Sequence, residues 1–293
     1  MSVTKQAWIY AFDRLTGEPI WPIVERSVPQ GDVPGEWYSP TQPFPTRPAA
    51  FDRQGFTEDD LIDYTPELRA MALEAVQDFR LSRTIFTPPS LQDHPDGTRG
   101  LLSLPSSTGG ANWEHSAFDP ETGIVYVPSR TQLQVLALAK NPDSDIDLSQ
   151  GFGVRAPRVQ GLEIVKPPYG RITAIDMNSG DHLWWIANAD TPERIKNHPL
   201  LEGIDVPRTG IPTRSGVLLT KTLLFVGEGT GGAGASPIFR AVDKTTGEIL
   251  FELDLPDNQT GLPFTYEHDG KQYLAMFVGG SGNPAQLVAY ALP

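Results

Sequence analysis

Short runs of alternating apolar and polar residues dominate this chain, and turn residues separate them. One region shows the pattern in full, with four consecutive runs at residues 216–220, 223–229, 237–247 and 248–255. Alternation over so few residues is typical of strands, and the close spacing predicts an antiparallel meander. A four-stranded meander that repeats along a chain is typical of a β-propeller blade.

The turn between the last two of these runs recurs along the chain in the pattern A-x-D-x-x-T-G-x-x-x-W. The three copies are Ala11, Asp13, Thr16, Gly17 and Trp21; Ala174, Asp176, Ser179, Gly180 and Trp184; and Ala241, Asp243, Thr246, Gly247 and Phe251. The Asp and Thr or Ser side chains can bond the turn backbone, and the Gly adopts the positive φ of a tight hairpin. We expect the aromatic residue to pack against a neighbouring unit. One copy would fit any β-hairpin, whereas three copies predict a repeat.

Other strand patterns extend this organisation. A further blade is predicted from 109–129 and 171–189, with a looped insertion between them, and an Asp269–Gly270 hairpin begins the last group of strands. The pattern predicts two complete blades flanked by two incomplete ones. The expected arrangement is a single partial propeller domain over 1–293, with blade strands at 1–23, an insertion at 24–100 and blades at 101–293.

The insertion is rich in proline and then becomes helical. Thr65 can cap a helix that has Pro66 in its first turn. The apolar residues at helical spacing are Leu68, Met71, Ala72, Ala75, Val76 and Phe79. An apolar stripe of this kind usually packs on a core, so we expect this helix to lie on the propeller.

Composition narrows the functional classes. The 293 residues are 39% hydrophobic and can bury a core, and the net charge of −13 disfavours nucleic acid as a partner. The sequence shows no apolar run long enough to span a bilayer and no signal-peptide pattern. The absence of cysteine excludes disulfides and thiolate metal ligands.

Taken together, the ordered segments resemble a known family. They are "TKQAWIYAFDRLTGEPIWPI", "QGDVPGEWYSPTQPFPTRP", "FTPPSL", "GGANW", "FDPETGIVYVPS", "KPPYGRITAIDMNSGDHLW", "LLFVGEG" and "DGKQYLAMFVGG". In their order and spacing the chain is similar to the C-terminal part of quinoprotein dehydrogenases of the membrane glucose and quinate dehydrogenase type. The resemblance implies an all-β fold: a β-propeller of four-stranded W-type blades, about half of an eight-bladed ring, with the helical insertion. It also implies pyrroloquinoline quinone (PQQ) as cofactor.

The resemblance assigns cofactor roles to four residues. Lys5 matches a family lysine that reaches the quinone oxygens, where an ammonium donor stabilises the negative charge of reduction. Asn112 matches an asparagine whose amide bonds the quinone, and Trp113 supplies an aromatic wall or core packing. Arg214 can pair with a PQQ carboxylate, and a surface loop arginine is the alternative.

The residues after Trp113 depart from the family pattern. The family usually has small residues there, and this chain has Glu114 and His115. The two could form an acid–base pair, but adjacent strand residues point to opposite faces and are poorly placed to act on one atom.

The resemblance also implies parts that this chain does not show. In the family, the calcium ligands and the catalytic aspartate lie in earlier blades, so the catalytic residue is unknown and Ca²⁺ belongs to the complete enzyme. The expected reaction oxidises a sugar or polyol hydroxyl in the periplasm and passes electrons to a quinone or cytochrome. A missing N-terminal half or a homodimer would complete the ring. A noncatalytic propeller scaffold that binds protein partners, or an inactive remnant of the enzyme, remain alternatives.

Overall fold

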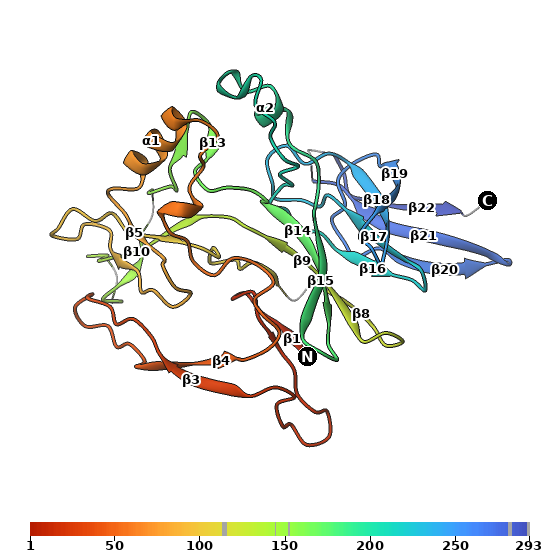
Figure 1. The fold of residues 1–293 in the computed structure, drawn as a ribbon, viewed down its shortest axis with the longest axis horizontal. Coiled ribbons are helices and arrows are strands. Elements are labelled where there is room, and N and C mark those ends of the chain that lie inside the picture. The colour runs from red at the N-terminus through yellow and green to blue at the C-terminus, as the bar shows by residue number, and fades with distance from the viewer. Residues whose placement is uncertain (113–115, 144, 152, 281–282, 292–293) are drawn as a thin grey trace. The chain divides into compact units, whose positions relative to one another are not determined.

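The computed structural model describes residues 1–112, 116–143, 145–151, 153–280 and 283–291. The chain divides into two compact units (Figure 1). The first unit comprises Met1–Gly110 and Thr131–Lys166, and the second comprises Ala111–Arg130 and Pro167–Pro293. Most of the regular structure is strand, and antiparallel pairing predominates. No helix within the described ranges is long and apolar enough to cross a membrane.

The second unit is built from three sheets. Its strands are β8 (Ala117–Asp119), β9 (Ile124–Arg130), β14 (Gly170–Asp176), β15 (Asp181–Ala187), β16 (Val217–Leu219), β17 (Leu223–Gly227), β18 (Ile238–Asp243), β19 (Ile249–Asp254), β20 (Phe264–His268), β21 (Lys271–Val278) and β22 (Gln286–Ala291). Two sheets have four strands, in the orders β15-β14-β9-β8 and β16-β17-β18-β19, and the third is β20-β21-β22. Short helices, α2 (Glu193–Lys196) and η2 (Pro199–Leu201), lie between β15 and β16.

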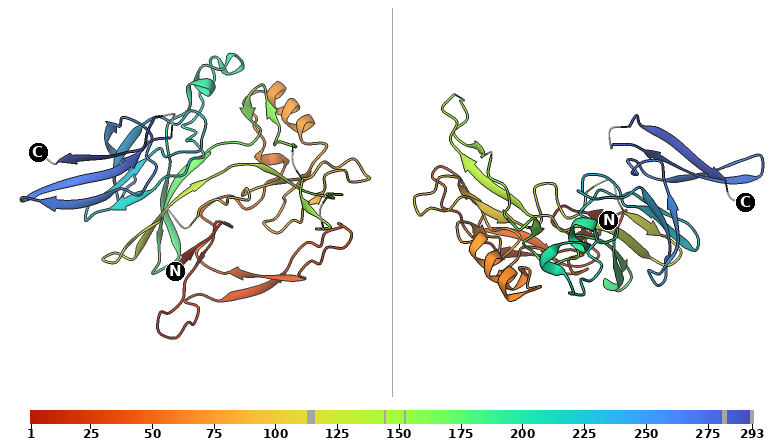
Figure 2. Two further views of the ribbon diagram at one scale, coloured as in Figure 1. Left: turned by 180° about the vertical axis from the view of Figure 1, so that it is seen from behind. Right: turned by 90° about the horizontal axis from the view of Figure 1, so that it is seen from above.

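These sheets confirm the predicted meanders. In β16–β19 each strand pairs with the next one in the chain, as the four alternating runs indicate. The sheet of β8, β9, β14 and β15 is also a meander, although residues of the first unit interrupt it between β9 and β14. The β20–β21 hairpin, blue in Figure 2, turns at Asp269 and Gly270 with φ of +50° and +72°. These angles are those of the two-residue turn that the Asp-Gly sequence favours.

The first unit contains shorter strands and the predicted helix. Its elements are β1 (Ser2–Val3), β2 (Ile9–Tyr10), β3 (Ile23–Ser27), β4 (Thr41–Pro45), η1 (Glu58–Asp60), α1 (Pro66–Ala75), β5 (Arg80–Leu81), β6 (Ser90–Leu91), β7 (Leu101–Ser103), β10 (Gln134–Ala139), β11 (Ser149–Gln150), β12 (Arg158–Val159) and β13 (Leu162–Glu163). Strand β10 organises this unit, because it pairs with β7 and β11 antiparallel and with β6 parallel. Strands β1–β2, β3–β4 and β12–β13 form separate pairs.

Helix α1 begins as the sequence predicts. The Thr65 hydroxyl accepts a hydrogen bond from the Leu68 N–H at 3.1 Å, and Pro66 occupies the first turn. Leu68 and Ala72 are fully buried, and the helix contacts β12. Met71 lies at the edge of the predicted apolar stripe and is 38% exposed, so the buried face is narrower than the spacing suggests.

Two of the repeated turns use the same hydrogen bonds. The Asp13 carboxylate accepts from the N–H groups of Leu15 and Thr16, and the Asp243 carboxylate accepts from those of Thr245 and Thr246. These backbone bonds hold the pKa of both carboxyl groups below its usual value. The aspartate therefore shapes each turn through its charged form.

The structure contains a fourth copy of the turn that the sequence pattern does not include. Ala117, Asp119, Thr122 and Gly123 fit the first part of the pattern, but Val127 stands where the aromatic residue is expected. Its turn is built in the same way, since the Asp119 carboxylate accepts from the Glu121 N–H at 3.0 Å and the Thr122 hydroxyl at 2.8 Å.

Apolar side chains fill the spaces between successive sheets of the second unit. One cluster joins the first two sheets and is made of Tyr126, Ile172, Ala174, Val217, Leu224, Val226 and Val242, with Trp184 and Ile186 packed against it. A second cluster joins the opposite face of β16–β19 to the last sheet and is made of Phe239, Leu255, Met276 and Val278. Each sheet therefore buries a face against its neighbour, as blades of a propeller do.

Trp184 explains why the repeat pairs a glycine with an aromatic residue. Its indole N–H donates to the Lys244 carbonyl at 3.3 Å, in the turn of the following sheet. A Cβ on Gly247 would lie 2.9 Å from the Trp184 ring. The aromatic residue of one copy thus covers the glycine turn of the next, as expected. Phe251 is 61% exposed, so the third copy lacks this contact within the described structure.

We predict that Gly247→Ala destabilises the chain more than Gly270→Ala. Both glycines have positive φ, at +79° and +72°, so both variants strain the backbone by about 1 kcal/mol. Only at Gly247 does the added Cβ meet a ring, whereas nothing lies within 4 Å of it at Gly270. Urea unfolding should show an additional loss of about 1–3 kcal/mol for Gly247→Ala. Equal losses would contradict the proposed contact.

A buried ion pair links the sheet of β8, β9, β14 and β15 to the sheet of β16–β19. The Lys244 ammonium lies 2.6 Å from the Asp119 carboxylate, and their side chains are 12% and 5% exposed. The Lys244 hydrogen bond lowers the pKa of Asp119 to about 2. Burial raises the pKa of the neighbouring Tyr126 hydroxyl to about 12, with Asp119 and Asp243 adding to that shift.

We predict that this pair makes stability depend on acid pH. Because the folded pKa of Asp119 lies below its unfolded value, the pair stabilises the fold above about pH 4, and this contribution is lost as the pH falls toward about 2. Lys244→Met should lower the free energy of unfolding by about 1–3 kcal/mol at pH 7. The deficit should shrink at pH 3, where Asp119 in the variant is protonated.

The control for this experiment is Lys221→Met, which removes an exposed lysine from the β16–β17 turn. Urea unfolding at both pH values should show little change for this variant. A Lys244→Met deficit that stays constant between pH 7 and pH 3 would exclude a role for Asp119 ionisation.

Candidate functional site

Lys5 lies in a tight turn between β1 and β2. The Thr4 N–H donates to the Trp8 carbonyl at 2.9 Å, and the Ala7 N–H donates to the Thr4 carbonyl at 3.1 Å. Ala7 takes a φ of +66°, which non-glycine residues seldom adopt. This closed turn leaves the Lys5 side chain exposed, and its ammonium donates to the Ser107 carbonyl at 3.2 Å.

The structure brings Lys5 together with the glycine-rich segment. The Gly110 N–H donates to the Lys5 carbonyl at 3.0 Å, and Gly109 closes a turn with φ of +87° by donating to the Ser106 carbonyl. A Cβ on Gly110 would lie 3.4 Å from the Cβ of Ala7, an ordinary van der Waals distance, so the two segments are packed closely together. Two stretches far apart in the sequence thus form one surface in the first unit.

Asp52 is a buried carboxylate beside this surface that the sequence analysis missed. It is 6% exposed, and its Oδ1 accepts from the Thr131 hydroxyl and the Arg53 N–H, both at 2.7 Å. Its Oδ2 is buried and has no hydrogen-bond partner among the described residues. The preceding residue, Phe51, donates its N–H to the Ala7 carbonyl at 3.0 Å. A lone aspartate among loop residues has no sequence signal that would distinguish it.

Two of the other predicted residues belong to the second unit. Asn112 is partly buried in the segment that leads toward β8. Arg214 forms a backbone bridge with Thr230, donating its N–H to the Thr230 carbonyl at 2.8 Å. Trp113 lies outside the described residues, as do Glu114 and His115.

The backbone around Arg214 is fixed by buried hydroxyl groups. The Ser215 hydroxyl donates to the Glu228 carbonyl at 3.1 Å and accepts from the Asn188 amide at 2.7 Å. The Thr213 hydroxyl also donates to the Glu228 carbonyl. Because Thr213 and Ser215 are buried, the alternation of an extended chain places the Arg214 side chain on the opposite, exposed side.

The donor chemistry of Lys5 fits a quinone. A lysine ammonium has three N–H groups, and Ser107 accepts one of them. The remaining N–H groups on an exposed side chain are available for carbonyl oxygens of a ligand. Within the described ranges, no group of three or more His, Cys, Asp or Glu residues is placed to hold a metal ion.

Comparison with known proteins identifies the family. Residues 1–274 match the family described as "Glucose/ethanol/alcohol dehydrogenase, beta-propeller domain". The chain therefore belongs to the PQQ-dependent dehydrogenase family, as the resemblance indicated.

Several relatives match along almost the whole chain. The glycerol dehydrogenase large subunit of Gluconobacter thailandicus is 31% identical over 99% of this chain and 42% of its own length. The quinate/shikimate dehydrogenase (quinone) of Acinetobacter baylyi is 28% identical over 99% of this chain and 37% of its own. The quinoprotein glucose dehydrogenase of Gluconobacter oxydans is 27% identical over 99% of this chain and 38% of its own. The chain thus spans between 37% and 42% of the length of these relatives.

One solved structure that overlaps this chain is a europium-containing methanol dehydrogenase. It covers 94% of this chain and 35% of its own, with 20% identity and a TM-score of 0.48.

We predict that Lys5→Ala leaves the fold intact. The side chain is exposed and makes one hydrogen bond to Ser107, so the free energy of unfolding should change by less than about 0.5 kcal/mol. Urea unfolding followed by circular dichroism measures this change. A loss of about 2 kcal/mol or more would instead make Lys5 a structural residue.

Proposed function

We propose that this chain is the C-terminal part of a PQQ-dependent dehydrogenase that oxidises a hydroxyl group of a sugar or polyol. Membership of the family and the names of the relatives, which include glycerol and quinoprotein glucose dehydrogenases, support this reaction class. The observation on which the proposal depends most is the exposed Lys5 ammonium, anchored on Ser107 beside the glycine-rich segment.

Lys5 is the proposed donor to the quinone oxygens. When bound, PQQ supplies the two-electron chemistry that protein side chains lack. An ammonium group already held near the acceptor oxygens needs little reorganisation to stabilise negative charge on them. Its turn and the Ser107 contact limit how far the Lys5 side chain moves.

Asn112, Trp113 and Arg214 are proposed as the other cofactor residues. Asn112 would bond the quinone through its amide, and Trp113 would cover one face of the ring. Arg214 is exposed on a loop whose backbone is fixed, which suits a guanidinium that pairs with a carboxylate.

The remaining features of the enzyme are also proposals. Ca²⁺ would be bound by residues outside this chain, and either an N-terminal half or a second copy would complete the ring. The acceptor would be a quinone or a cytochrome, since one relative is named "Quinate/shikimate dehydrogenase (quinone)" and another "Lupanine 17-hydroxylase [cytochrome c]". A periplasmic location is the last of these proposals, and the resemblance to the family supports it.

We predict that the chain binds PQQ saturably in the presence of Ca²⁺. Loss of a charged hydrogen bond should weaken binding to Lys5→Ala by about 10–100-fold. The measurement is a titration with PQQ followed by its absorbance and by tryptophan fluorescence.

Lys221→Ala is the matched control, because it removes another exposed lysine of the chain. This variant should bind PQQ like the wild type. Equal weakening in both variants would indicate a general charge effect. The absence of saturable binding would mean that the cofactor site forms only in the full ring or has been lost.

A further inference from the structure

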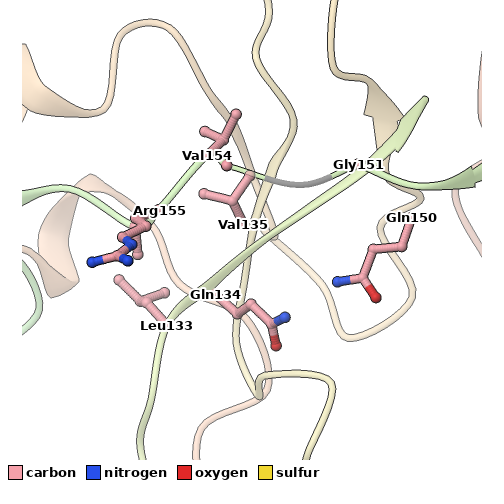
Figure 3. Close-up of a pocket in the computed structure, with 9 residues that line it drawn as sticks. Leu133, Gln134, Val135, Gln150, Gly151, Val154 and Arg155 are labelled. Carbon is pink, nitrogen blue, oxygen red and sulfur yellow. The ribbon is translucent and has the colours of Figure 1, made fainter.

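A pocket of about 310 Å³ lies against the beginning of β10 in the first unit (Figure 3). Its described lining comes from residues 133–135, 150–151 and 153–156, where the chain returns along β10 after β11. The Gly151 N–H donates to the Ala137 carbonyl at 2.8 Å and so fixes the start of this return. A pocket of this volume is large enough for a small-molecule ligand.

Hydrogen bonds connect the pocket to Lys5. Gln134 lines the pocket, and its Oε1 accepts from the Ser107 N–H at 3.0 Å and from the Ser107 hydroxyl at 2.6 Å. The carbonyl of the same Ser107 accepts from the Lys5 ammonium at 3.2 Å. One residue therefore separates the wall of the pocket from the proposed cofactor donor.

The polar groups of the pocket are available to a ligand. Gln134 uses its oxygen on Ser107, which leaves its Nε2 to donate. No hydrogen bond to the Gln150 side chain or to the Arg155 guanidinium is found among the described residues. Val135 and Val154 supply apolar walls between these groups. In Figure 3, Arg155 lies beside Leu133, whereas Gln134 and Gln150 lie toward the other end.

The described lining of the pocket carries a positive charge and no negative one. The protein has 36 acidic and 23 basic residues, yet none of the described lining residues is acidic and Arg155 is the charged one. An arginine guanidinium favours a carboxylate, which it can bind through two parallel hydrogen bonds. Glutamine amides suit hydroxyl groups, because they both donate and accept.

We propose that this pocket binds the substrate and that the substrate class is a small polyhydroxy carboxylic acid. The Arg155 guanidinium holds the carboxylate, and the amides of Gln134 and Gln150 hold hydroxyl groups at the end connected to Lys5 through Ser107. This assignment rests on the proposed function, because the hydroxyl group that the enzyme would oxidise then lies at the end of the pocket that is connected to Lys5.

The test compares two probes that differ in charge. D-gluconate carries a carboxylate, and D-glucitol is its uncharged counterpart with the same number of carbons. Binding of each probe to the full chain is measured by ligand-observed NMR titration at fixed ionic strength, without PQQ. The wild type should bind gluconate saturably and at least about tenfold more tightly than glucitol.

Arg155→Gln should weaken gluconate binding by about 10–100-fold and leave glucitol binding unchanged. The matched control is Arg158→Gln, three residues away, which removes the same charge from an arginine that pairs with Glu163 and does not line the pocket. This control should keep the wild-type preference. Equal effects of the two variants on gluconate, or failure of the wild type to bind gluconate, would overturn the proposal.

Gln150→Leu is a second variant, and its result is informative even if Arg155→Gln does not fold. It should weaken both probes to a similar degree, because the amide contacts hydroxyl groups that they share. Unchanged binding of both probes would contradict the placement of the hydroxyl end. The probe titration omits PQQ, so the two proposals can fail separately. Gluconate binding without PQQ binding would refute only the cofactor role, and PQQ binding without gluconate binding would refute only the substrate pocket.

Discussion

The contact between the Trp184 indole and the Gly247 turn links the first two sheets of the second unit. The turn that contains Lys244 and Gly247 receives the indole on its glycine, a hydrogen bond on its Lys244 carbonyl, and the Asp119 carboxylate on its Lys244 ammonium. Trp184 and Asp119 come from one sheet, and the turn comes from the next. Close packing of the indole on the glycine is thus combined with two hydrogen bonds, whose geometry is directional, on one turn.

The parts of the fold that sequence predicts are those determined locally. A Thr-Pro pair defines the start of α1, and Asp269–Gly270 defines a hairpin, because each signal acts within a few residues. The strands of β16–β19 follow the same logic, since each pairs with its neighbour in the chain. Strand β10 shows the limit. Its parallel partner β6 lies more than 40 residues earlier and consists of Ser90–Leu91, too short for any periodicity to show.

The residues of the candidate site also fall into two groups, those that the sequence predicts and those that only the structure reveals. Lys5 is predicted as a site residue because family resemblance preserves its sequence context, and the structure brings it together with Gly110 in the first unit. Asp52, Ser107 and Gln134 were not identified. Their importance comes from tertiary contacts: a buried oxygen of Asp52 without a hydrogen-bond partner among the described residues, and hydrogen bonds that join Ser107 to residues from both segments of the first unit. Residue type and spacing contain no trace of such contacts.

Ser107 joins the proposed cofactor residue to the proposed substrate pocket, and different atoms of Ser107 make the two contacts. Its carbonyl accepts from Lys5, while its N–H and hydroxyl donate to Gln134. The carbonyl belongs to the main chain, so no side-chain substitution at Ser107 removes it. A substitution at Gln134, however, removes the hydrogen bonds that hold the Ser107 backbone in place. Gln134 is therefore a poor position at which to alter substrate preference without disturbing Lys5. Arg155 has no such connection among the described residues, so charge selectivity can vary there while the Lys5 surface is preserved.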